Sequence, residues 1–173
     1  MQTLTAPDGT TIAHQVTGSG PALVLVVGAF CDSSSTADLT ALLADSFTVV
    51  EYDRRGRGAS GDTPPWTPQR EVEDLTAVIA ATGGPPFVYG HSSGGVIALE
   101  AAAAGVPMRA LVVYEPPYTA GEDGSGGSGE LLEQVRGLVG AGDVDGAVAA
   151  FIGATGAPPE VVAAMRSSPG WRG

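Results

Sequence analysis

The fold of this chain is decided by one stretch, Pro86-Phe87-Val88-Tyr89-Gly90-His91-Ser92-Ser93-Gly94-Gly95. Its first four residues are typical of a strand, and the small residues at 96–104 that follow it favour a helix. Between them lies a GxSxG pattern, which in this context is a strained turn that exposes the serine hydroxyl. Ser92 is therefore the candidate nucleophile.

A serine hydroxyl is a weak nucleophile until a base takes its proton. The chain has two histidines, His14 and His91. His14 lies in a predicted hairpin, where we expect a surface or sheet-face side chain. His91 is adjacent to Ser92 and points elsewhere in so sharp a turn. The sequence therefore predicts a nucleophile without predicting its base.

The composition is that of an ordinary globular domain. Of the 173 residues, 43% are hydrophobic and 16% are charged, and a chain of this length can bury roughly 70% of its extended surface. A net charge of -11 disfavours nucleic acid or an anionic membrane as a partner, because both need a basic face.

The compartment is expected to be the cytoplasm. The longest apolar run, residues 22–30, is far shorter than a bilayer span, and the first residues lack the pattern of a signal peptide. The single cysteine, Cys31, excludes an internal disulfide. We interpret it as a small, half-buried apolar side chain.

Strand and helix signals alternate up to residue 114. A hairpin is predicted around Asp8-Gly9, and short apolar runs indicate buried strands at 22–27, 47–52, 86–89 and 110–114. Helices are indicated by a stripe of Leu39, Leu42 and Leu43, by the cap Thr67-Pro68 with the apolar residues after it, and by residues 96–104. This alternation predicts an α/β fold with a mainly parallel sheet and flanking helices.

The composition changes after residue 118. Residues 119–129 are rich in Gly, Ser and acidic side chains, as in a flexible connector. Helical periodicity follows over 131–138 and 144–152, with Asp143 as a cap, and again from Pro158. We therefore divide the chain into a core, residues 1–118, and a linker with helices, residues 119–173.

Together these features resemble the α/β-hydrolase superfamily, in particular its small-molecule branch with a helical lid after the sixth strand. Two further motifs carry the resemblance: Tyr52-Asp53-Arg54-Arg55-Gly56-Arg57-Gly58-Ala59-Ser60 after an earlier strand, and Tyr114-Glu115-Pro116-Pro117 before the lid. It implies an α/β-hydrolase fold lacking the last strands, plus the start of the lid. In the family the arginine-rich stretch is a structural loop, so we expect its arginines to pair with local carboxylates and not with a phosphate.

The resemblance also implies roles for individual residues. Ser92 is the nucleophile, in a turn so tight that positions 90 and 94 need glycine. The N–H of Ser93 is one oxyanion donor, helped by the helix dipole, and the N–H of Ala29 is the candidate for the second. Val27 replaces the family's usual histidine and removes a side chain that braces this loop. No metal or organic cofactor is implied.

The acid and the base of the triad are left unassigned. In most members the acid follows a seventh strand, which the sequence does not contain. Glu115 follows the sixth strand and is a minor candidate for the acid, the alternative being that it only closes this strand. The family's histidine follows the last strand. We therefore expect a second chain or C-terminal fragment to complete the sheet and the triad, and the present chain to be inactive alone.

The predicted activity is the hydrolysis of an ester or similar small carbonyl compound through an acyl-enzyme on Ser92. Two alternatives stay open. One is a catalytically inactive binding or scaffold module on a degenerate hydrolase fold. The other is a non-hydrolytic member of lyase or cyclase type.

Overall fold

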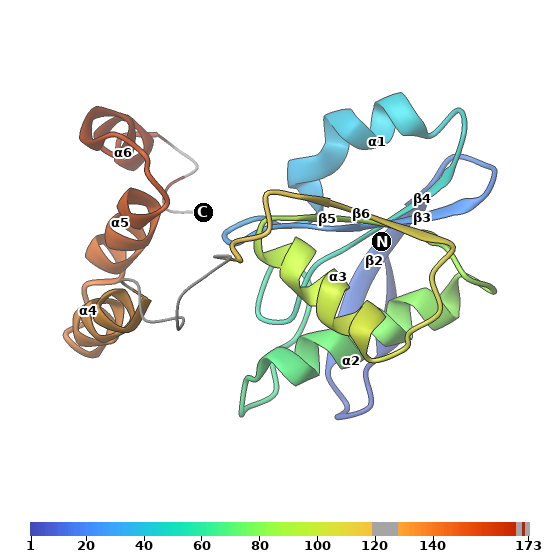
Figure 1. Ribbon diagram of the computed structural model, residues 1–173, viewed down its shortest axis with the longest axis horizontal. Helices are drawn as coiled ribbons and strands as arrows, with labels where there is room; N and C mark the ends of the chain where they lie inside the picture. The colour runs from blue at the N-terminus through green and yellow to red at the C-terminus, as the bar shows by residue number, and fades with distance from the viewer. Residues whose placement is uncertain (119–127, 169–170, 172–173) are drawn as a thin grey trace. The chain divides into compact units, whose positions relative to one another are not determined.

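The computed structural model describes residues 1–118, 128–168 and 171. The chain divides into two compact units, Met1–Tyr118 and Thr119–Gly173 (Figure 1). None of the helices among the described residues combines the length and the apolar character that a membrane crossing requires.

The first unit is built on a six-stranded sheet with the order β1-β2-β4-β3-β5-β6. The strands are β1 (Gln2–Thr5), β2 (Thr11–Thr17), β3 (Ala22–Val26), β4 (Thr48–Tyr52), β5 (Phe87–His91) and β6 (Ala110–Tyr114). The last four run parallel to one another, whereas β1 and β2 form an antiparallel hairpin that joins β4. The predicted mainly parallel sheet is confirmed.

Helices cover both faces of this sheet. A 3-10 turn, η1 (Ser33–Thr36), and α1 (Ala37–Leu43) lie on one face, and α2 (Pro68–Ala81) and α3 (Ser93–Ala103) lie on the other (Figure 1). On the α2–α3 face, fully buried side chains of the strands pack against Leu75 and Val78 of α2 and Ala98 and Ala101 of α3. The small residues of α3 let its axis lie close to the strands, as the sequence indicated.

Local signals explain where these elements begin and end. Thr67 Oγ1 accepts a hydrogen bond from the Arg70 N–H at 3.3 Å, which is the expected N-cap of α2. β5 continues two residues past the predicted strand, because its ladder with β6 extends to His91 opposite Tyr114.

One residue that the sequence pattern assigned to the core is exposed in the structure. Leu39 and Leu43 of α1 pack against Leu23, Leu25 and Val49 of the sheet, but Leu42 is 80% exposed. Successive residues are about 100° apart around a helix, so Leu42 lies well to the side of Leu43. A helix of seven residues presents only a narrow stripe to the sheet.

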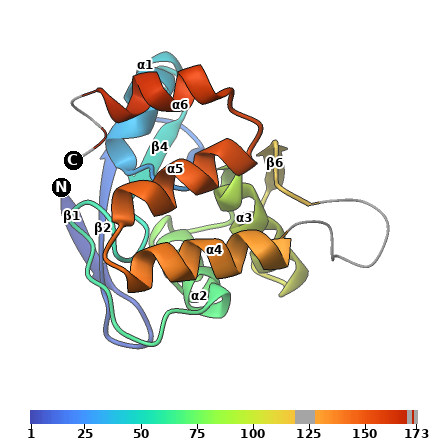
Figure 2. The same ribbon diagram turned by 90° about the vertical axis from the view of Figure 1, so that its left-hand side faces the viewer.

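The described residues of the second unit form the helices α4 (Ser128–Gly140), α5 (Val144–Ala154) and α6 (Pro159–Arg166), joined by short turns (Figure 2). Asp143 caps α5 by accepting the Gly146 N–H at 2.8 Å. Asp145 of α5 pairs with Arg166 and accepts a hydrogen bond from the Trp171 indole. The three predicted helices are confirmed, whereas the predicted connector lies mostly outside the described residues.

Candidate active site

Ser92 occupies a strained turn between β5 and α3. Its backbone has φ 53° and ψ -124°, a left-handed conformation that costs energy for any residue other than glycine. The turn is held from both sides, because the Ser92 N–H donates to the Tyr114 carbonyl and the Ser92 carbonyl accepts the Gly95 N–H, each at 2.9 Å. Ser92 is half-buried, and its hydroxyl has no hydrogen-bond partner among the described residues.

Close backbone packing explains the glycines on either side of Ser92. A Cβ at Gly90 would lie 2.7 Å from Gly95 Cα, and a Cβ at Gly94 would lie 2.5 Å from the Val27 carbonyl oxygen. Both distances are far below a normal van der Waals contact distance, and the atoms approached belong to the backbone, which cannot move away as a side chain can. The turn can therefore form only with glycine at both positions.

The loop that follows β3 packs directly against this turn. A Cβ at Gly28 would lie 3.2 Å from Ser92 Cβ and 3.3 Å from His91 Nδ1. Ala29 is the next residue, and neither its N–H nor that of Ser93 is used in a hydrogen bond between the described residues. Two N–H groups beside the Ser92 turn are thus available to bind an anionic oxygen.

Arg54 joins the two halves of this site. Its Nη1 donates to Ser93 Oγ at 2.9 Å and to the Val27 carbonyl at 3.1 Å, while Nε and Nη2 bind the Glu71 carboxylate at 2.5 and 2.6 Å. Although burial opposes its charge, the hydrogen bonds to Glu71 raise the pKa of Arg54. The pairing with a carboxylate was expected, but the contacts with Ser93 and Val27 were not.

Arg57 braces the same loop from another side. It donates to the Gly28 carbonyl at 2.5 Å and to the Cys31 carbonyl at 3.3 Å, so the expectation of a carboxylate partner is wrong for this arginine. Burial, followed by the positive charge of Arg54, lowers the pKa of Arg57. Two guanidinium groups therefore hold this loop, in which Val27 provides no polar side chain that could do so.

Arg55 pairs with carboxylates as predicted. It binds Asp74 through Nε at 2.7 Å and Nη2 at 2.8 Å, and Asp8 through Nη1 at 2.9 Å. The hydrogen bonds to Asp74 raise the pKa of Arg55 above its usual value. Arg55 thereby ties the β1–β2 hairpin to α2, and it makes no hydrogen bond with the Ser92 turn.

Neither histidine forms a hydrogen bond with Ser92. The His91 ring is turned toward Tyr114, with the two ring centroids 5.8 Å apart. His14 lies in β2 and is 8% exposed, so it is a buried sheet-face residue and not a surface one. Glu115 is exposed directly after β6, with φ 49°. Within the described residues it has no partner that would mark it as the acid.

The family model for the alpha/beta hydrolase family matches residues 23–173. The chain belongs to the alpha/beta hydrolase family.

Solved and curated relatives of this alpha/beta hydrolase agree with the match. An alpha/beta hydrolase from Sphaerobacter thermophilus has a TM-score of 0.92 and 45% sequence identity, over 99% of this chain and 67% of that one. A pimeloyl-[acyl-carrier protein] methyl ester esterase from Stenotrophomonas maltophilia is 41% identical over 112 residues, which are 63% of this chain and 42% of that protein. YraK of Bacillus subtilis, an uncharacterized hydrolase, is 37% identical over 102 residues, 57% of this chain and 37% of that protein. The chain thus spans well under half the length of these two curated relatives.

A pocket of about 240 Å³ adjoins the Ser92 turn of this hydrolase on the α1 face. It lies between η1 and α1 on one side and β3, β5 and β6 on the other, and Ser92 is not among its lining residues. His91, Tyr89 and Tyr114 contribute rings, and burial raises the pKa of Tyr89. Cys31 also lines it and is half-buried, as predicted. Nowhere in the described part of the chain do three or more His, Cys, Asp or Glu side chains come together as a metal site.

Proposed function

We propose that this protein is a serine hydrolase that cleaves an ester or a similar small carbonyl compound through an acyl-enzyme on Ser92. The observation that carries the proposal is the strained, half-buried serine, whose hydroxyl has no partner in the described part of the chain, beside the N–H groups of Ser93 and Ala29. The relatives named as methyl ester esterases favour a carboxylic ester as the substrate.

The proposed mechanism begins with attack of Ser92 Oγ on the carbonyl carbon of the substrate. The carbonyl oxygen becomes negatively charged and accepts hydrogen bonds from the Ser93 and Ala29 N–H groups. Ser93 is the first residue of α3, so the positive end of the helix dipole adds to this stabilisation. The alcohol leaves, and water then hydrolyses the ester between the acyl group and Ser92.

The base and the acid come, in this proposal, from a second chain or a C-terminal portion that completes the site. Two observations support it: neither histidine of this chain is bonded to Ser92, and the curated relatives are more than twice as long as the matched region. The free edge of β6, which has a neighbour on one side only among the described strands, offers a place where further strands can pair.

A fluorophosphonate probe tests the nucleophile, because it reacts covalently only with an activated serine hydroxyl. In the assembled protein we expect one adduct, located at Ser92 by peptide mass spectrometry. Ser92→Ala should abolish it, whereas Ser19→Ala, at an exposed serine of the same unit, should not. Hydrolysis of a p-nitrophenyl ester should fall by about 10³-fold or more in Ser92→Ala, and retained hydrolysis would contradict an acyl-enzyme on Ser92.

Native mass spectrometry tests the proposed completion in trans. The active preparation should contain a companion polypeptide besides the 17.2 kDa chain, and the chain alone should label weakly. An active preparation that contains a single 17.2 kDa species would contradict this part of the proposal and leave the role of Ser92 untouched.

A further inference from the structure

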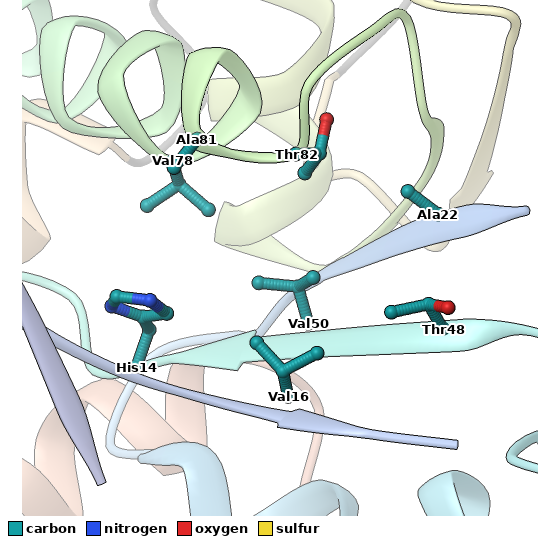
Figure 3. A pocket seen from close by; sticks show the side chains of 8 residues that line it. All are labelled: His14, Val16, Ala22, Thr48, Val50, Val78, Ala81 and Thr82. Atoms are coloured by element: carbon teal, nitrogen blue, oxygen red, sulfur yellow. The ribbon is translucent and has the colours of Figure 1, made fainter. Parts of the chain in front are cut away.

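A second pocket, of about 150 Å³, lies on the α2 face of the sheet. It is bounded by β2, by the first residues of β3 and β4, and by the C-terminal part of α2 (Figure 3). In the sheet, β3 separates β4 from β5, and no lining residue belongs to the Ser92 turn or to the loop after β3. The pocket is therefore separate from the candidate active site.

The pocket has a buried floor and an open rim. Val50 and Val78 are 5% and 0% exposed, whereas Val16 at the rim is 45% exposed and Ala81 of α2 is also exposed. The floor and most of the wall are thus apolar, and a ligand can enter from solvent without unfolding of the sheet. The lining includes no formally charged carboxylate or guanidinium group, so a small ion is not the expected occupant.

His14 is the polar group at the floor of this pocket. Figure 3 shows its ring rising from β2 toward Val78 of α2. Its Nδ1 atom is buried and has no hydrogen-bond partner among the described residues. A buried polar atom without a partner is uncommon in folded proteins and costs stability.

The other polar lining side chains are already engaged. Thr48 Oγ1 donates to the Gly20 carbonyl at 2.8 Å, and Thr82 Oγ1 lies 2.7 Å from the carbonyls of Ile79 and Gly84. Tyr52, which lies directly opposite His14 in the β2–β4 register but does not line the pocket, also has a buried hydroxyl without a partner in the described part of the chain. Of the side chains that line the pocket, His14 alone has a buried polar atom without a hydrogen-bond partner among the described residues.

We propose that this pocket binds a small, mostly apolar molecule with one hydroxyl group, of the size and kind of a phenol. Its ring would lie against Val50 and Val78, and its hydroxyl would bind the His14 imidazole. A cavity of this volume holds a benzene-sized molecule, and a hydroxyl satisfies either tautomer of the ring because it both donates and accepts. So few ligand atoms give a Kd on the order of 1 mM.

An NMR titration with phenol and with toluene distinguishes the contribution of the hydrogen bond to binding from that of the shape of the pocket. Phenol should shift the amide resonances of residues such as Val16, Val50 and Val78 in a saturable way. Toluene has nearly the same size but no hydroxyl, and we expect it to bind about tenfold more weakly. Because the readout is binding to this chain, it does not depend on the hydrolase activity.

Two variants place the ligand in the pocket. His14→Phe keeps a ring but removes its nitrogens. The affinity for phenol should therefore fall about tenfold, to that for toluene. Ala81→Phe fills the rim from an exposed helix position and should abolish binding of both compounds. Ala80→Phe is its matched control, since Ala80 is exposed on the same helix and is not a lining residue.

Binding of phenol that Ala81→Phe removes and Ala80→Phe preserves would establish the site even if His14→Phe fails to fold. The proposal would be overturned by the lack of a saturable shift up to about 20 mM phenol, roughly twenty times the expected Kd. Equal affinities for phenol and toluene, or an Ala81→Phe variant that binds like the wild type, would also overturn it.

Discussion

Arg54 donates a hydrogen bond to the side chain of Ser93, with 2.9 Å between Nη1 and Oγ. Ser93 follows the candidate nucleophile and supplies one proposed oxyanion donor from its backbone. The same guanidinium nitrogen binds the carbonyl of Val27, in the loop that supplies the other. One side chain therefore links the two parts of the site, and Glu71 fixes its orientation through two further hydrogen bonds.

The first prediction concerns this bridge. Arg54→Met would leave the Glu71 carboxylate, which is 3% exposed, buried without its cation, so the free energy of unfolding should fall by about 3 to 5 kcal/mol. Arg54→Met/Glu71→Leu removes both charges and should recover most of this loss. Urea denaturation of the three proteins measures both effects. A single variant that loses less than about 1 kcal/mol would show that the buried Glu71 carboxylate does not depend on Arg54 for its compensation.

The second prediction concerns the glycine after the turn. A Cβ at position 94 would collide with the carbonyl oxygens of Val26 and Val27, so Gly94→Ala should force the loop after β3 away from Ser92. We expect a loss of about 3 kcal/mol or more in the free energy of unfolding, and loss of fluorophosphonate labelling in the assembled protein. Gly84→Ala, with nothing within 4 Å of the added Cβ, is the control and should be close to neutral.

The third prediction is a pH dependence at Asp8. The hydrogen bond from Arg55, and then the one from the Thr10 N–H, hold the pKa of Asp8 well below its usual range. A carboxylate with a depressed pKa in the folded state stabilises the protein at pH values above its unfolded pKa of about 3.9, and this contribution is lost as pH falls toward the folded value.

Asp8→Asn should therefore be less stable than the wild type at pH 7, with a difference that begins to shrink below about pH 4. Chemical denaturation at pH 7 and at lower pH values measures this difference. Asp38→Asn, at a residue that forms no ion pair with another described residue, serves as the control. A difference that stays constant with pH would contradict the role given to Asp8.

The fourth prediction concerns the edge and face of β6. Val112 and Tyr114 are 60% and 54% exposed on the same side of this strand. An unpaired strand edge with apolar side chains favours association, so the isolated chain should self-associate as its concentration rises.

Val112→Lys should shift sedimentation toward the monomer, because a charged side chain blocks pairing at a strand edge. Val139→Lys alters a comparably exposed valine in α4, which is 53% exposed, and should leave the association unchanged. Equal behaviour of the two variants would mean that β6 is not the surface of association.

Much of the fold was predictable because it rests on signals between neighbours in the chain. The strand at residues 110–114, the cap at Thr67 and the turn around Ser92 are each encoded within a few residues, by apolar runs, a capping hydroxyl and glycine spacing. These signals act locally, so they predict the same structure whatever packs around them.

The sequence by itself thus determined the α/β architecture and the candidate nucleophile. The tertiary structure alone decided that Arg54 reaches Ser93 and Val27, that Arg57 binds carbonyls, that Leu42 faces solvent and that His14 lines a pocket. The arginine and histidine contacts join segments far apart in the chain, and the exposure of Leu42 depends on how α1 lies on the sheet. The packing of the strands and helices determines which residues meet, and a local pattern of residue types does not contain this information.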